Sequence, residues 1–139
     1  MELKQIGIIH SPYKESSQAP PQGRMKDELF EIELFDEYLE GLKDVEKVSH
    51  LIVLYWCDKA ERDVLTVVTP WEDKPHGVFA TRSPRRPNPI AFDIVDLVKI
   101  DKNKLLVKKM DALDGSPLLD IKPYSEKIDC ITGTKGIRD

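Results

Sequence analysis

The sequence has few of the features that mark a secreted, metal-stabilised or membrane protein. It contains two cysteines, Cys57 and Cys130, which match neither a CxxC motif nor a metal-ligand spacing. We expect both to be packed or incidental thiols in a reducing compartment. The longest apolar run, residues 51–57, is far shorter than the roughly 18 residues of a membrane span, and the N-terminus has no signal-peptide stretch. The sequence therefore predicts a soluble, cytoplasmic protein.

Signals for a nucleotide-binding α/β fold and for a metal centre are also missing. No glycine-rich turn joins a strand to a helix, and strands and helices do not alternate, which disfavours a Rossmann-type domain. None of the histidines, His10, His50 and His76, forms a pair at metal-ligand spacing or follows a nucleophile motif. We therefore expect no metal, and we interpret His50 as a residue of the core or of its margin.

The charge of the chain is unevenly distributed. The net charge of −4 argues against a general nucleic-acid binder. Acidic residues crowd positions 27–40, whereas positions 81–90 hold Arg82, Arg85 and Arg86 and no acid. This contrast predicts a local anion-binding site on an otherwise acidic protein.

Short strand-like runs predominate, in a chain of 139 residues that we expect to form one domain. Alternating or apolar runs predict strands over residues 3–10, 29–35, 48–56, 63–69, 78–80, 91–100, 104–113 and 118–121. We expect 48–56 to be a fully buried strand, 91–113 to form a hairpin, and 36–42 to form a helical turn capped by Asp36. The pattern predicts a mainly β protein, a barrel or closed sheet with little helix.

Two long segments without strand signals, residues 11–26 and 69–88, hold most of the ten prolines. Long loops in a compact domain are uncommon and usually functional or disordered, and proline limits their conformational freedom. We interpret these Pro-rich loops as the walls of a pocket.

The strongest chemical signal is residues 81–90, Thr-Arg-Ser-Pro-Arg-Arg-Pro-Asn-Pro-Ile. Prolines hold this loop extended, and guanidinium groups bind carboxylate or phosphate through a planar fork. The alternative is a solvated loop whose arginines pair with the acidic stretch at 27–40. We favour the anion-binding interpretation, because pairing surface charges does not require spaced prolines.

Two further segments are weaker signals. Asp114-Gly-Ser-Pro is a turn by composition, and it also offers a carboxylate and a hydroxyl, so both a plain turn and a binding site remain open. Tyr13 and Gln22 lie in the first Pro-rich loop, where Gln22 offers donors and acceptors. A rigid linker is the alternative for this loop.

Together these segments resemble the TsaA-like family, also called the TrmO family, of tRNA methyltransferases. The matching stretches follow the family's order: Ile6–Glu15, Ser49–Leu51, Gly77–Arg82, Arg86–Ile90 and Leu113–Tyr124. The resemblance implies a single-sheeted β-barrel that binds S-adenosylmethionine, usually as a homodimer. It implies methylation of N6 of N6-threonylcarbamoyladenosine at position 37, in the anticodon loop of tRNA. Bacterial members carry a C-terminal tRNA-holding domain, and we expect this chain to be a short form without one.

The resemblance also implies residue roles. Cofactor-binding positions fall on Pro20, Pro21, Gln22, Cys57, Asp58, Arg82, Phe92, Asp114, Gly115, Ser116 and Pro117. The family usually has a basic residue where this chain has Pro21. The residues expected to meet RNA or the modified base are Arg85, Arg86, Asn88, Lys122 and Tyr124.

No residue is an obvious base for the proton that the acceptor nitrogen loses. The candidates are Tyr13, His50 and Asp114. Two alternatives to a tRNA methyltransferase remain: a non-catalytic S-adenosylmethionine-binding or sensing module, and a methyltransferase that acts on another RNA or a small molecule.

Overall fold

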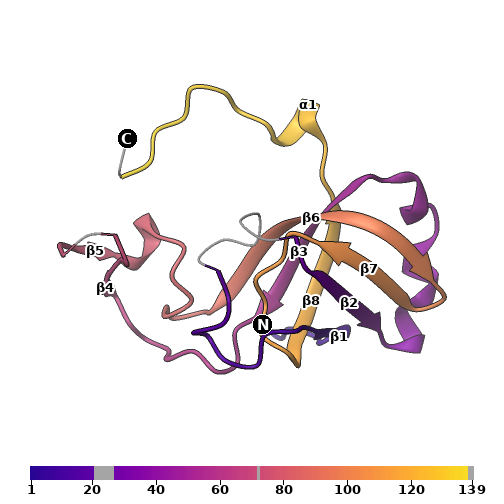
Figure 1. The fold of residues 1–139 in the computed structure, drawn as a ribbon, viewed down its shortest axis with the longest axis horizontal. Coiled ribbons are helices and arrows are strands. Elements are labelled where there is room, and N and C mark those ends of the chain that lie inside the picture. The colour runs from indigo at the N-terminus through magenta and orange to yellow at the C-terminus, as the bar shows by residue number, and fades with distance from the viewer. Residues whose placement is uncertain (21–26, 72, 138–139) are drawn as a thin grey trace.

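Six antiparallel strands close into a barrel whose interior is the hydrophobic core (Figure 1). The structure, a computed structural model, describes residues 1–20, 27–71 and 73–137. Around the barrel the strands follow the order β1, β2, β7, β6, β3, β8 and back to β1. Their bounds are Gly7–His10 for β1, Leu29–Leu34 for β2, His50–Trp56 for β3, Ile90–Asp101 for β6, Lys104–Lys108 for β7 and Ser116–Pro123 for β8. The predicted mainly β class and the barrel are confirmed.

The barrel wall has one face toward the core and one toward solvent. Along β2 the side chains of Phe30, Ile32 and Leu34 point inward and are buried, as the alternating sequence predicts. The expectation that residues 48–56 form a fully buried strand is wrong. In β3 only every second side chain is buried, because the outer face of a barrel strand has no second layer upon it.

The predicted hairpin joins β6 to β7. Lys102 adopts a left-handed conformation at the turn, with φ of 55°, and Asn103 donates from its Nδ2 to the Leu34 carbonyl of the neighbouring strand at 2.8 Å. The prediction that the second strand continues to residue 113 is wrong. It ends at Lys108, because Lys109 has a φ of 74°, which no strand accommodates.

A second, two-stranded sheet lies beyond the barrel (Figure 1). It consists of β4 (Thr66–Val68) and β5 (Pro75–Gly77), paired antiparallel. The predicted strand at 63–69 is therefore shorter and does not belong to the barrel. Residues 78–80 form a 3₁₀ turn, η4 (Val78–Ala80), which corrects the strand expected there. β5 itself carries no apolar pattern, and the sequence did not predict it.

Helix is scarce, as expected. A 3₁₀ helix, η2 (Asp36–Leu42), occupies the expected turn, but Phe35 is its N-cap and makes no side-chain cap bond, so the assignment of Asp36 as the cap is wrong. A shorter 3₁₀ turn, η3 (Val45–Lys47), follows it. After β8 the chain forms the single turn α1 (Glu126–Asp129) and runs away from the barrel in the view of Figure 1. No helix in the described ranges is long and apolar enough to cross a membrane.

Candidate functional site

A cavity of about 870 Å³ opens at one end of the barrel. The antiparallel register brings the end of β3 beside the start of β6, with Trp56 opposite Ile90. The start of β8 lies on the other side of β3. Three kinds of segment line the cavity: the first Pro-rich loop, the Arg/Pro loop (residues 81–90), and the ends of the barrel strands. Lining residues include Lys14, Ala19 and Pro20; Arg82, Pro84, Arg85 and Arg86; and Tyr55, Cys57, Asp58, Phe92, Asp111 and Ser116.

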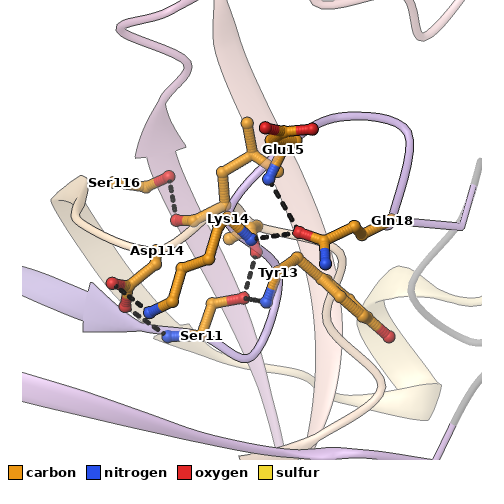
Figure 2. A network of polar contacts seen from close by, with 9 residues as sticks. Ser11, Tyr13, Lys14, Glu15, Gln18, Asp114 and Ser116 are labelled. Atoms are coloured by element: carbon orange, nitrogen blue, oxygen red, sulfur yellow. Dashed lines mark hydrogen bonds and ion pairs between the residues drawn. The ribbon is translucent and has the colours of Figure 1, made fainter.

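Hydrogen bonds fasten the first Pro-rich loop to the turn that precedes β8 (Figure 2). The Asp114 carboxylate accepts from the backbone N–H of Ser11 at 2.9 Å and from Lys14 Nζ at 2.7 Å. Both contacts lower the pKa of Asp114 below its usual range, Lys14 most. Gln18 closes the loop by accepting from the backbone N–H groups of Lys14 and Glu15. The wall of the cavity is thus tied to the barrel by local polar contacts.

The Arg/Pro loop is braced from within by Arg86. Its guanidinium donates to the carbonyl oxygens of Val78, Thr81 and Ser83, at 2.9 to 3.1 Å. A five-donor fork suits this role, because a loop without strand pairing leaves its carbonyls without partners. Arg86 therefore shapes the loop, and its donors are directed at protein carbonyls.

The other two arginines of the loop are exposed and lie at the cavity. The Arg82 guanidinium stacks on the Phe92 ring, 5.3 Å from its centroid. Arg85 pairs with Glu61 at 3.1 Å. The partners of these two arginines lie in β6 and in residues 58–61. The alternative, in which they pair with the acidic stretch at 27–40, is therefore not supported.

The floor of the cavity is acidic. The Tyr55 hydroxyl donates to Asp111 Oδ1 at 2.5 Å, and the Asp111 backbone N–H donates to Asp93 Oδ2 at 3.3 Å. Burial and the neighbouring Asp111 raise the pKa of Asp93 to about 9. Burial, followed by the two carboxylates, raises the pKa of the Cys57 thiol to about 12, so this cysteine is a protonated, unreactive thiol. Cys130 is a free, exposed thiol, in keeping with the expectation that the two cysteines are packed or incidental.

We expect Asp93→Asn to stabilise the protein at neutral pH. An unfolded aspartate has a pKa of about 3.9, so between about pH 4 and pH 9 folded Asp93 retains a proton that the unfolded chain has released. The free energy of unfolding therefore falls as pH rises through this window, and asparagine removes that loss. The expected gain at pH 7 is at least about 2 kcal/mol, measured by urea unfolding.

The difference between Asp93→Asn and the unchanged protein should grow from pH 5 to pH 8.5. Asp96→Asn is the control, because Asp96 lies on the same strand and pairs with His50 at the surface. A difference that stays constant with pH would contradict a raised pKa at Asp93.

The structure brings together many of the residues implied by the resemblance. Those that line the cavity are Pro20, Cys57, Asp58, Arg82, Phe92 and Ser116, together with Arg85 and Arg86. Pro21 and Gln22 lie outside the described residues. Asp114, Gly115 and Pro117 do not line the cavity. Asp114 and Gly115 form the turn before β8, where Gly115 has the left-handed φ of 83° that the turn requires, and Pro117 lies in β8 opposite Ile8. Asp114-Gly-Ser-Pro thus begins with a turn, as its composition predicts, and Ser116 lies in the cavity lining, so a binding role for the segment stays a prediction.

Three residues expected to meet RNA lie apart from the cavity lining. The Asn88 side-chain oxygen accepts from Arg62 at 3.4 Å. Lys122 and Tyr124 lie at the far end of β8 from Ser116, where Lys122 pairs with Asp120. Any contact of these two residues with RNA would therefore lie at a distance from the cavity.

The candidate bases do not line the cavity either. Tyr13 is buried edge-on against Phe30, and its ring points away from Asp114 in Figure 2. Burial and Glu28 raise its pKa to about 12. His50 pairs with Asp96 at 3.3 Å at the opposite end of β3, and its side chain is 41% exposed, so the interpretation of His50 as a core residue is wrong.

One group of potential metal ligands occurs among the described residues. His10, Glu31 and Glu33 lie on the outer face of β1 and β2, with His10 Nε2 3.2 Å from Glu33 Oε1. They are separate from the residues that line the cavity, and the His10–Glu33 ion pair accounts for their approach.

Sequence reasoning missed the acidic group at the floor of the cavity, where Tyr55 and Asp111 belong to the lining and Asp93 lies behind it. Tyr55 and Asp93 are embedded in strand patterns that predict packing only, and Asp111 was assigned to a strand that ends earlier. An aspartate at an inward position of a barrel strand is the signal that points to Asp93, because an unpaired carboxylate is costly to bury.

A closed barrel with a cavity walled by arginine and proline at one end defines a class of small-molecule-binding β-barrel. Residues 8–130 match the family described as the tRNA-methyltransferase O N-terminal domain. The chain belongs to this family, as the resemblance predicts.

Curated relatives have names of two kinds. A "Probable S-adenosyl-L-methionine-binding protein" of Archaeoglobus fulgidus is 56% identical over 97% of this chain, which spans 37% of that relative. An "S-adenosyl-L-methionine-binding protein" of the same organism is 52% identical over 98% of both chains. The "tRNA (adenine(37)-N6)-methyltransferase" of Escherichia coli is 37% identical over 88% of this chain and 57% of the enzyme.

Solved structures share the barrel. A crystal structure of TrmO superposes with a TM-score of 0.85 at 31% identity, covering 100% of this chain and 64% of that one. TrmO from Pseudomonas aeruginosa superposes with a TM-score of 0.81 at 30% identity, covering 98% of this chain and 61% of that one. This chain therefore spans less than two thirds of these TrmO chains.

Proposed function

We propose that residues 1–139 form one domain that binds S-adenosylmethionine in the cavity and transfers its methyl group to tRNA. The acceptor we propose is N6 of N6-threonylcarbamoyladenosine at position 37, a substrate that would place the protein in the cytoplasm. The observation that carries the proposal is the convergence of the two Pro-rich loops and the start of β8 on one cavity, in a chain related to an adenine-37 methyltransferase.

The residues of the cavity fit S-adenosylmethionine. Its volume of about 870 Å³ is in the range of cofactor sites. Arg82 offers a cation for the methionyl carboxylate, and the Phe92 ring, 40% exposed, offers an apolar face for the adenine. The acidic floor at Asp111 suits the positive end of the same molecule.

Arg85 supports contact with an anionic acceptor. Its guanidinium is 54% exposed and pairs with Glu61 in an exposed ion pair, a kind that contributes little to stability. A phosphate or the threonyl carboxylate of the modified base can replace Glu61 as the partner of this guanidinium. The anticodon loop is accessible to such contacts because its bases can splay out.

We also propose a homodimer. Large apolar side chains are exposed in two regions outside the barrel: Leu65, Val68, Trp71 and Phe79 around the small sheet, and Ile128, Ile131 and Ile137 in the C-terminal segment. Apolar groups gathered in this way favour a protein–protein interface. Sedimentation equilibrium tests this proposal, and a monomer at micromolar concentration would rule it out.

A second function is supported by the names of the relatives. The Archaeoglobus fulgidus protein that matches this chain over 98% of both lengths is called an S-adenosyl-L-methionine-binding protein. A module that binds the cofactor without transferring a methyl group is therefore the alternative to an enzyme.

The two functions are separated by incubating the purified chain with radiolabelled S-adenosylmethionine. One tRNA sample carries threonylcarbamoyladenosine at position 37, and the matched control is the same tRNA without that group. We expect label to enter the first tRNA alone, and nucleoside analysis should locate it on the modified adenosine. Cofactor binding without transfer to either tRNA would favour the binding module, whereas equal labelling of both would contradict the proposed acceptor.

A further inference from the structure

We propose that Asp111 accepts the proton that the acceptor nitrogen loses during methyl transfer, and that Tyr55 and Asp93 position its carboxylate. This inference rests on the proposed function. It extends the proposed function by assigning the general base, a role for which the sequence offered three other candidates.

Asp111 meets the geometric requirement for a base. It lines the cavity three residues after the end of β7, and it is half-buried. The Tyr55 hydroxyl holds Oδ1 from the side of β3 at 2.5 Å, and the backbone N–H of Asp111 is anchored on Asp93 at 3.3 Å. The Tyr55 hydroxyl thus orients the carboxylate itself, and Asp93 anchors the backbone that carries it. This gives the carboxylate the defined direction that proton transfer in a transition state requires.

The charges at the floor also favour Asp111 as the anion. Asp93 is 6% exposed and lies behind Asp111, away from the cavity lining. Two carboxyl groups in contact do not both ionise in a buried place, and burial together with Asp111 raises the pKa of Asp93 to about 9. Near neutral pH Asp93 therefore keeps its proton, and Asp111 is the member of the pair that faces the cavity.

The other acidic groups in contact with the site are engaged differently. Glu61 pairs with Arg85 at the rim, and Glu15 and Asp58 line the cavity from the loops of its wall instead of its floor. Asp114 is neutralised by Lys14, and both Asp114 and Tyr13 lie outside the cavity lining. Asp111 combines a place in the cavity with a hydroxyl donor, Tyr55, that fixes its orientation.

The step balances in charge and atoms. When bound, S-adenosylmethionine supplies a methyl group on a positively charged sulfur. The lone pair of the acceptor nitrogen forms the new nitrogen–carbon bond, while the electron pair of the breaking sulfur–carbon bond stays on sulfur. The Asp111 carboxylate takes the N–H proton, so that a cation and an anion are both neutralised. Asp111 and the sulfur atom thus both become neutral, and no water molecule is needed to carry the proton away.

The test uses single-turnover methylation of threonylcarbamoylated tRNA by the full chain, with three Asp→Asn variants. We expect Asp111→Asn to lower the transfer rate by about 100-fold or more while it still binds S-adenosylmethionine. Asp93→Asn, whose amide can donate the hydrogen bond of a protonated Asp93, should lose only about threefold. Asp96→Asn, on the same strand at the far end of the barrel, should match the unchanged protein.

An Asp111→Asn variant that binds the cofactor and transfers methyl groups within about threefold of the unchanged protein would overturn the inference and leave the proposed function standing. Equal losses in Asp111→Asn and Asp93→Asn would also overturn it, because they would indicate a merely structural pair. If the unchanged protein transferred no methyl group at all, the proposed function and this inference would fall together.

Discussion

Gly7→Ala is expected to destabilise the barrel by about 3 kcal/mol or more. A Cβ at this position would lie 2.3 Å from the backbone oxygen of Glu33 and 3.1 Å from Leu118 Cδ2. The first contact is with the backbone of the paired strand β2, so β1 can relieve it only by moving away from β2 with loss of strand pairing. The second requires the Leu118 side chain of β8 to shift by a few tenths of an ångström. Urea unfolding monitored by tryptophan fluorescence measures the change.

Gly41→Ala is the matched control for this substitution. Gly41 lies in η2, where an added Cβ meets nothing within 4 Å, so stability should change by less than about 0.5 kcal/mol. Equal stabilities of the two variants would show that β1 can move away from β2. Because β1 leads directly into Ser11 and Lys14, we also expect Gly7→Ala to weaken ligand binding in whatever fraction remains folded.

The fold was largely predictable because side chains along each strand of a barrel wall alternate between the apolar core and the outer face. Phe30, Ile32 and Leu34 identify a strand and its inner face with no knowledge of its partners. This alternation does not show at which residue strand pairing ends. Lys109 ends β7 by a left-handed backbone conformation, and a lysine in a run of mixed residues gives no sign of it.

The site was predictable as a set of segments but not as a set of roles. Composition and the family resemblance placed Arg82, Arg85 and Arg86 in one important loop. Their different tasks depend on which atoms lie within reach of each guanidinium, namely a ring, a carboxylate, or the loop's own carbonyls. Such contacts are made between residues distant in the chain, or by the detailed course of a loop, and spacing in the sequence specifies neither.

The acidic floor of the cavity is a second example of contacts that spacing in the sequence does not specify. Asp93 and Asp111 are 18 residues apart, and neither belongs to a recognisable motif. They meet because β7 turns back along β6, so that the chain leaving β7 passes the start of β6. The register of the β6–β7 hairpin makes them neighbours, and because the sequence does not specify that register, the bases that it suggested were sought elsewhere.

Arg82→Ala is expected to weaken binding of S-adenosylmethionine by about 100-fold, because a charge-assisted contact with its carboxylate is worth about 1.5–3 kcal/mol. The Arg82 guanidinium is held over the Phe92 ring, so the cation is already in place before the ligand arrives. Isothermal titration calorimetry measures the loss. The free energy of unfolding should stay within about 0.5 kcal/mol, since Arg82 is exposed.

Two comparisons separate this role of Arg82 from a general effect of charge. Lys47→Ala removes a cation outside the cavity lining, which pairs with Asp44 at 3.0 Å at the surface, and should change affinity by less than about threefold. Methylthioadenosine keeps the adenosine part of the ligand but lacks the carboxylate, so its affinity should be nearly the same for Arg82→Ala and the unchanged protein. If Arg82→Ala weakened both ligands equally, Arg82 would act on the adenosine end through Phe92, and the carboxylate would have to be held by another residue of the cavity.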